Sequence, residues 1–302
     1  MAQLLEKALE LPHSLKPSLN GLGKVESFVE LHPDHRWKMV AKVVPLGDDR
    51  TEVTVRRVNM QKVVDLAQIP RRRGPRIQTD ERDMENIARA GQRARKAVRH
   101  LCQLMKVDRM LTFGTRCTIP LSELLADFQR FARSYGIATG KKLEYVAVPE
   151  PHADGDHWHI HVAMRGWFDI TTGLRIWHAL RAKDDADHLV NGSINIKTFR
   201  VRNGTEDFVS IIAGYISKYV GKSLATAFNS KSYWATRVKR DEHQYHLLES
   251  QTPEAALNEV CVKLGVPLQC ILLTHEGCFF PLLEQSGFWL KVTPEMPRTF
   301  PF

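Results

Sequence analysis

Hydrophobic residues in the middle of the chain recur at the spacing of an α-helix. The clearest stripe advances in steps of three and four through Ile87, Ala90, Ala94, Val98, Leu101 and Met105. This stripe predicts a helix from residue 79 to about 105, with Thr79 as its N-cap. Similar spacing predicts helices over 120–135, ending at Gly136, and over 174–182, 206–221 and 253–264.

Shorter apolar or alternating runs between these helices predict β-strands over 109–115, 143–148, 158–164 and 193–197. The connection from 148 to 158 is too short for the helical crossover that joins parallel strands, so we expect antiparallel pairing. The order of elements predicts an α+β fold with a mainly antiparallel central sheet flanked by helices.

The two ends of the chain read differently from the middle. Segments 38–44 and 52–58 flank a turn-like stretch and predict a hairpin, and 268–273 reads as a strand. We therefore expect four parts: an N-terminal β-rich region (1–75), a basic helix with its connector (76–106), a core (107–230) and a C-terminal extension (231–302).

Composition narrows the class of partner. Lys and Arg number 43 against 34 Asp and Glu, a formal net charge of +9, which favours a polyanion such as nucleic acid. No apolar run is long enough to span a membrane, and the first residues do not form a signal peptide, so we expect a cytoplasmic protein without a membrane partner. The five cysteines form no C-x-x-C pair and are expected to be reduced thiols.

Two groups of basic residues are candidates for phosphate contacts. Arg71, Arg72 and Arg73 stand before a Gly-Pro pair, in a segment that is either a solvated linker or a DNA contact. Arg89, Arg93 and Lys96 repeat along one face of the helix expected over 79–105. That stripe either follows a DNA backbone or is the helix's solvated side.

Histidines cluster at the start of one predicted strand. His157, His159 and His161 alternate, so their side chains project from one face, where two imidazoles can reach a single metal ion. Glu150 ends the preceding strand and can add a carboxylate. This donor set is compatible with Mn²⁺, Mg²⁺ or Zn²⁺. The plainer interpretation is a chance pattern of structural histidines.

A second signal lies in the helix expected over 206–221. Tyr215 and Tyr219 are one turn apart, and Lys218 and Lys222 each follow a tyrosine by three residues. A phenol with a pKa of about 10 is a poor nucleophile at neutral pH unless a nearby cation and a polarised phosphate assist it. Both tyrosines also lie on the apolar stripe of the helix, so two core aromatics are the alternative.

Taken together, the strand at 109–113, the His159-Ile160-His161 motif and the Tyr215…Lys218-Tyr219 motif resemble the HUH endonucleases in order and spacing. The resemblance covers about 110–225. It is to rolling-circle replication initiators, the two-tyrosine kind of filamentous and other single-stranded DNA phages and of plasmids. It implies an HUH endonuclease core within 107–230.

The resemblance also implies roles for individual residues. His159 and His161 match the metal-binding pair, for Mn²⁺ or Mg²⁺. Glu150 takes the place of the third ligand, with Asp154, Asp156 and His157 as competitors. Tyr215 and Tyr219 match the paired nucleophiles, and Lys218 matches the lysine between them. For Lys222 we expect a DNA contact.

In such initiators a tyrosine cuts one strand of the origin, giving a 5′-phosphotyrosine and a free 3′-OH, and strand transfer later closes the circle. The implied partners are single-stranded origin DNA and, in a bacterial cell, a host helicase and replication polymerase. A separate helicase is expected because the sequence has no P-loop motif. The alternatives are an HUH transposase or relaxase, or a basic DNA-binding regulator without catalysis.

Overall fold

The structure is a computed structural model. It describes residues 37–47, 50–61, 80–115, 118–152, 157–182, 192–197, 199, 208–226, 232–250, 252–265, 271–272 and 287–292. The chain divides into two compact units, one formed by 1–76 with 240–302 and the other by 77–239. The four boundaries expected from the sequence stay predictions.

The first unit is built on an antiparallel sheet with the order β8-β1-β2-β10-β9. Its strands are β1 (Trp37–Pro45), β2 (Thr51–Asn59), β8 (Gln244–Leu248), β9 (Ile271–Leu272) and β10 (Gly287–Val292). The hairpin expected at the N-terminal end is confirmed by the antiparallel pairing of β1 with β2. Strands from the far end of the chain flank that hairpin, β8 beside β1 and β10 beside β2.

Helix α7 (Pro253–Leu264) covers one face of this sheet. Thr252 caps its start by accepting a hydrogen bond from the Ala255 N–H, and Gly265 ends it in the left-handed conformation. Ala256 and Val260 of α7 share a buried cluster with side chains of β1, β2 and β8. The helix predicted over 253–264 is therefore confirmed.

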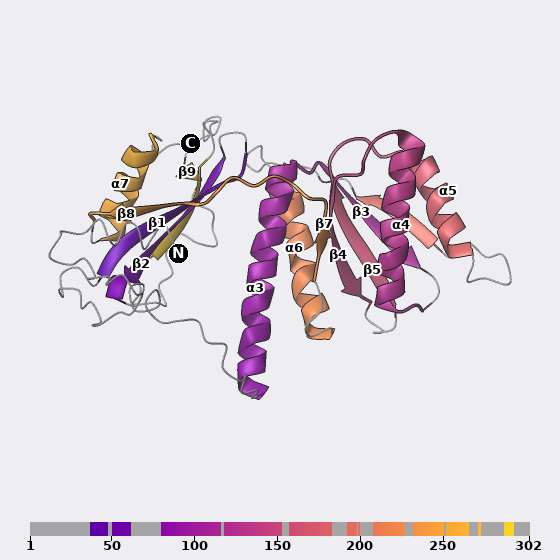
Figure 1. Ribbon diagram of the computed structural model, residues 1–302, viewed down its shortest axis with the longest axis horizontal. Coiled ribbons are helices and arrows are strands. Elements are labelled where there is room, and N and C mark those ends of the chain that lie inside the picture. The colour runs from indigo at the N-terminus through magenta and orange to yellow at the C-terminus, as the bar shows by residue number, and fades with distance from the viewer. Residues whose placement is uncertain are drawn as a thin grey trace, which may run out of the picture. The chain divides into compact units, whose positions relative to one another are not determined.

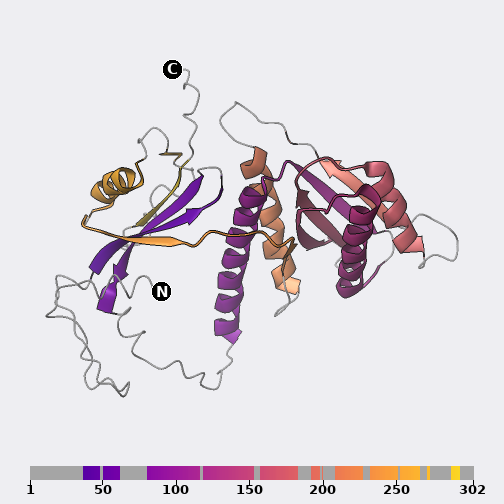
Figure 2. The ribbon, with the colours of Figure 1, turned by 45° about the horizontal axis from the view of Figure 1, so that its top comes forward.

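The second unit contains an antiparallel sheet with the order β6-β3-β5-β4-β7. Its strands are β3 (Arg109–Thr115), β4 (Tyr145–Pro151), β5 (Trp158–Met164), β6 (Gly192–Lys197) and β7 (Trp234–Ala235). Helices α3 (Asp80–Met105) and α6 (Phe208–Thr226) lie on one face. Helices α4 (Leu121–Thr139) and α5 (Ile170–Arg181) lie on the other (Figures 1 and 2). The expected α+β class with antiparallel pairing is confirmed.

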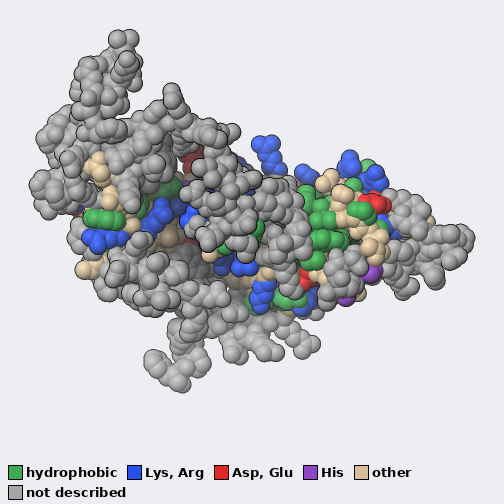
Figure 3. All heavy atoms as spheres, turned by 90° about the horizontal axis from the view of Figure 1, so that it is seen from below, with side chains coloured by type: hydrophobic (Ala, Val, Ile, Leu, Met, Phe, Trp, Pro, Cys, Tyr) green, Lys and Arg blue, Asp and Glu red, His purple; other side chains and the backbone are tan. Residues whose placement is uncertain are grey.

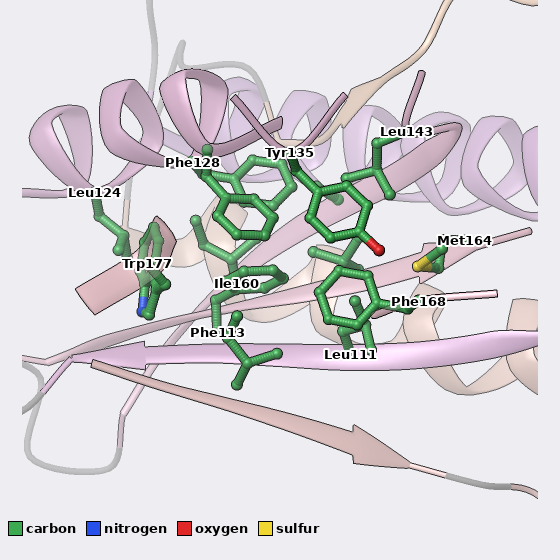
Figure 4. Close-up of a cluster of buried hydrophobic side chains, with 14 of the residues drawn as sticks. Leu111, Phe113, Leu124, Phe128, Tyr135, Leu143, Ile160, Met164, Phe168 and Trp177 are labelled. Atoms are coloured by element: carbon green, nitrogen blue, oxygen red, sulfur yellow. The ribbon is translucent and has the colours of Figure 1, made fainter. Parts of the chain in front are cut away.

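An aromatic core fills the space between the sheet and the α4/α5 layer (Figure 4). Phe113 of β3 meets Phe128, Phe131 and Trp177 edge-on, with ring centroids 4.8 to 5.2 Å apart. Edge-to-face contacts of this kind add to the stabilisation that burial alone gives. This face is therefore a closed packing surface.

The opposite face of the sheet changes character along its strands. Val146 of β4 and Ala163 of β5 are buried against α3 and α6, together with Val98 and Ile212 from those helices. Because side chains alternate along a strand, His161 lies on the same face as Ala163, two residues nearer the start of β5. The apolar packing thus gives way to polar groups towards the end of β4 and the start of β5.

Two helix boundaries differ from those expected. Helix α4 continues through Gly136 to Thr139, where Gly140 takes the left-handed conformation with φ 67°. Gly136 is tolerated within the helix, and Gly140 supplies the C-cap. Helix α5 begins at Ile170, earlier than expected, because the Asp169 carboxylate accepts hydrogen bonds from the Thr171 and Thr172 N–H groups. Within the described ranges, no helix is long and apolar enough to cross a membrane.

Candidate active site

A histidine and a carboxylate on neighbouring strands form the centre of the candidate site. The Nε2 atom of His161 on β5 lies 2.6 Å from Oε2 of Glu150 on β4. On its other side, Nδ1 of His161 lies 3.1 Å from Oγ1 of Thr112 on β3. Register explains the grouping, because Thr112 stands opposite His161 across β3 and β5. Both ring nitrogens of His161 are thereby held in place.

This pair is largely removed from solvent. The side chains of His161 and Glu150 are only 8% and 14% exposed. Burial lowers the pKa of His161, while the hydrogen bond to Glu150 acts in the opposite direction. The imidazole is therefore held close to the neutral form that binds metals.

The paired tyrosines of α6 lie directly against this centre. The ring of Tyr219 stacks on the imidazole of His161, with centroids 3.9 Å apart and an angle of 15° between the planes. Tyr215, one helical turn earlier, meets Tyr219 at 5.3 Å and 70°. Both tyrosines are half-buried, and the buried residues beside them on α6 are Ile216 and Val220. The structure thus brings the histidine and tyrosine motifs together.

A lysine from the edge strand completes the cluster. The ammonium of Lys197 on β6 lies 3.8 Å from the centroid of the Tyr215 ring. Hydrogen bonding to Lys197 is the largest cause of a lowered pKa of Tyr215, and a hydrogen bond with Tyr219 adds to it. Burial raises the pKa of Tyr219, and its hydrogen bond with Tyr215 acts in the same direction. The two phenols are chemically different.

The remaining histidines are spread around the start of β5. His159 stands opposite Glu150 in the register of β4 and β5, and its imidazole reaches the backbone of Gly114 on β3. The ring of His152 lies 5.2 Å from that of His159. His157 instead approaches Thr118, with 3.3 Å between Nε2 and Oγ1. Among the competitors for the third ligand, Asp154 and Asp156 lie outside the described residues.

The donor set suits a divalent metal although the side chains do not form a ready-made cage. Within the part of the chain that is described, no three His, Cys, Asp or Glu side chains converge on one point. His161 and Glu150 nevertheless face each other through Nε2 and Oε2, and His159 projects from the same face of β5. Imidazole with carboxylate is a set that Mn²⁺ accepts, and Mg²⁺ accepts the carboxylate most readily.

The other predicted residues are less central. Lys218 is exposed on α6, and the cation beside Tyr215 is Lys197 instead. Arg89 and Arg93 are exposed on α3, and Lys96 is half-buried. Arg71, Arg72, Arg73 and the side chain of Lys222 lie outside the described residues. Lys and Arg side chains are spread over the face seen in Figure 3, with few Asp or Glu among them.

Comparison with known families assigns the segment that contains this cluster. Residues 110–224 match the family model of the replication-associated protein ORF2/gene II protein. This segment belongs to that replication-associated family. No curated protein and no solved structure matches the chain significantly.

The replication-associated segment runs from β3 to near the end of α6 and so includes every part of the cluster. Two of its residues were missed by sequence reasoning, Lys197 and the side chain of Thr112 as a partner of His161. Both lie in segments predicted as strands. A register for those strands would have placed them on the face of His161.

Proposed function

We propose that the chain initiates rolling-circle DNA replication by nicking one strand of an origin with a tyrosine and later rejoining it. The observation that carries this proposal is the stack of Tyr219 on His161, with Tyr215 and Glu150 beside it. A tyrosine pair packed only as core would be buried in aliphatic side chains. Here the phenols adjoin a histidine and carboxylate that can bind metal, inside a segment of a replication-associated family.

In the proposed reaction a tyrosine oxygen attacks the scissile phosphorus. The new O–P bond replaces the bond from phosphorus to the 3′-oxygen, and the phenol's proton ends on the released 3′-hydroxyl. The bond energy is kept in the phosphotyrosine, so the later joining step is the same exchange in reverse and needs no nucleotide cofactor. Two tyrosines allow one to hold the first end while the other cuts again.

We assign His159, His161 and Glu150 to hold a divalent ion, Mn²⁺ or Mg²⁺. When bound, such an ion supplies Lewis-acid polarisation of a phosphate oxygen. The chain itself orients His161 through Thr112 and packs Tyr219 over the imidazole. Lys218 retains a proposed role in contacting the phosphate, since its side chain is exposed next to both tyrosines in the sequence.

For DNA binding we propose contacts from α3, where Arg89 and Arg93 are exposed, and from the basic residues at 71–73 and Lys222. Such contacts weaken as salt concentration rises, because they release counterions from the DNA. The further partners that we propose are a host helicase and a replication polymerase, which would extend the free 3′-OH.

The decisive experiment incubates the protein with labelled single-stranded oligonucleotides tiled across its own replicon, with and without Mn²⁺. Wild type is compared with Tyr215→Phe, Tyr219→Phe and the double variant on a denaturing gel. We expect a metal-dependent adduct that resists SDS and that the double variant does not form. DNA binding without an adduct on any oligonucleotide would favour a non-catalytic regulator instead.

A further inference from the structure

The two tyrosines of α6 have different neighbours. Tyr215 has the Lys197 ammonium 3.8 Å from its ring centroid, and the ring of Phe199 meets it edge-on at 5.4 Å. Tyr219 has its ring stacked on His161 at 3.9 Å. One phenol is thus next to a cation, while the other is tied to the imidazole that we assign as a metal ligand.

We propose that Lys197 selects Tyr215 as the first nucleophile and that the stack on His161 holds Tyr219 for the second cleavage. This inference rests on the proposed nicking activity and gives its two tyrosines an order. Sequence spacing alone treats them alike, since each is followed three residues later by a lysine of the same helix.

Strand register explains how Lys197 reaches the site. Asn195 of β6 stands opposite Thr112 of β3, which stands opposite His161 of β5, so these three residues share one face of the sheet. Lys197 follows Asn195 by two residues and projects from the same face. It thereby lies on the side of the sheet that α6 covers.

A lysine on an edge strand also has a plainer explanation. Edge strands carry lysines that discourage pairing with other chains, and such side chains extend into solvent. The ammonium of Lys197 instead lies against the aromatic rings of Tyr215 and Phe199, at 3.8 and 5.4 Å from their centroids. Because Lys197 is classed as exposed, the fold does not depend on burying it.

The chemistry requires no additional reactant. As Tyr215 attacks, its oxygen loses a proton, forms the bond to phosphorus and displaces the 3′-oxygen, which gains the proton. Lys197 exchanges no atoms with the DNA. It is a positioning residue that holds positive charge beside the phenol while negative charge develops on it.

The test measures which tyrosine carries the DNA. Adducts formed with the tiled oligonucleotides and Mn²⁺ are quenched at early times, digested with trypsin and analysed by mass spectrometry. Cleavage after Lys218 places Tyr215 and Tyr219 in different peptides. We expect early wild-type adduct mainly on Tyr215.

Substitutions of Lys197 separate its role from a structural one. An opposite charge this close changes the population of an ionised group by about tenfold or more, so Lys197→Met is expected to slow adduct formation on Tyr215 by about that factor. Adduct formation on Tyr219, measured in Tyr215→Phe, should change little with the added Lys197→Met substitution. Lys197→Arg should restore the preference for Tyr215. Lys142→Met, which alters an exposed lysine outside the site, should match wild type.

Equal early labelling of both tyrosines, or an equal loss on both in Lys197→Met, would overturn the inference while leaving the nicking activity established. No adduct with wild type on any oligonucleotide would overturn the proposed function, and this inference with it.

Discussion

Substitution of Thr112 by valine tests whether His161 is a metal ligand. The Thr112 hydroxyl lies 3.1 Å from Nδ1 of His161, while Nε2 faces Glu150. A hydroxyl can donate to a bare Nδ1 or accept from a protonated one. Metal binding at Nε2 requires the proton on Nδ1, and Thr112 stabilises that tautomer by accepting its hydrogen bond. Valine keeps the shape and removes this partner.

The size of the effect follows from burial. Because the His161 side chain is only 8% exposed, water replaces the lost hydroxyl poorly. A buried donor without its partner costs about 1–3 kcal/mol. If about 1–2 kcal/mol of this falls on the metal-bound form, Mn²⁺ binding weakens by about 5- to 30-fold. That range overlaps the roughly 10- to 100-fold losses typical of outer-shell partners.

The assay is the rate of adduct formation as a function of Mn²⁺ concentration, read as the concentration for half-maximal rate. Thr118→Val is the matched control, because Thr118 makes a similar contact to a different histidine, His157, at 3.3 Å. We expect Thr112→Val to need more Mn²⁺ and Thr118→Val to resemble wild type. If Thr112→Val left the Mn²⁺ dependence unchanged and Thr118→Val weakened it, the ligand would be His157 and the reasoning on His161 would be refuted.

Two further predictions concern stability. Asp127 and Arg181 form a fully buried ion pair, so Asp127→Asn is expected to cost about 3 kcal/mol, the lower end for a broken buried pair because Glu123 stays 3.8 Å from Arg181. At about 2–4 °C per kcal/mol, calorimetry should show a Tm lower by about 6–12 °C. Partial burial acts to raise the pKa of Glu259, but hydrogen bonds from Ser250 and its neighbours prevail and lower it to about 2 from the usual 4.5. Urea unfolding should therefore show Glu259→Gln less stable than wild type at pH 7, with the difference shrinking as pH falls from about 4.5 to 2.

Each of these has a control in the structure. Arg130 is the exposed partner of Asp127, with its side chain 54% exposed, and Arg130→Met should change stability by no more than about 1 kcal/mol. Equal losses in Asp127→Asn and Arg130→Met would show that burial does not set the strength of this pair. For Glu259, the sign is decisive. A group with a depressed pKa stabilises the fold above its usual pKa, so a difference that grew on acidification would contradict the assignment.

Much of the candidate site was predictable because its motifs are local. Alternation along a strand places His159 and His161 on one face, and the four-residue spacing places Tyr215 and Tyr219 one turn apart on a helix. Both inferences need only the period of the element. That His161 and Tyr219 stack on each other depends on how α6 crosses the sheet, and the sequence indicated this only through its resemblance to a family.

The rest depended on pairing between distant segments. Lys197 belongs to the site because β6 pairs with β3, and the join of the far end of the chain to the N-terminal hairpin depends on β8 and β10 finding β1 and β2. Hydrophobic patterns identify a strand without naming its neighbour. Helix ends failed for a different reason: Gly136 and Gly140 are both glycines near the end of α4, and only backbone conformation shows which one stops the helix.

The placement of the tyrosines follows from the packing of α6. Ile212, Ile216 and Val220 are fully buried against the sheet, which fixes the rotation of the helix about its axis. With that rotation fixed, Tyr215 and Tyr219 come to the edge of the buried stripe, where the apolar face of the sheet ends and Glu150 and His161 begin. The same contacts that stabilise α6 therefore hold two phenols at the boundary between core and polar site, where a DNA strand could reach them.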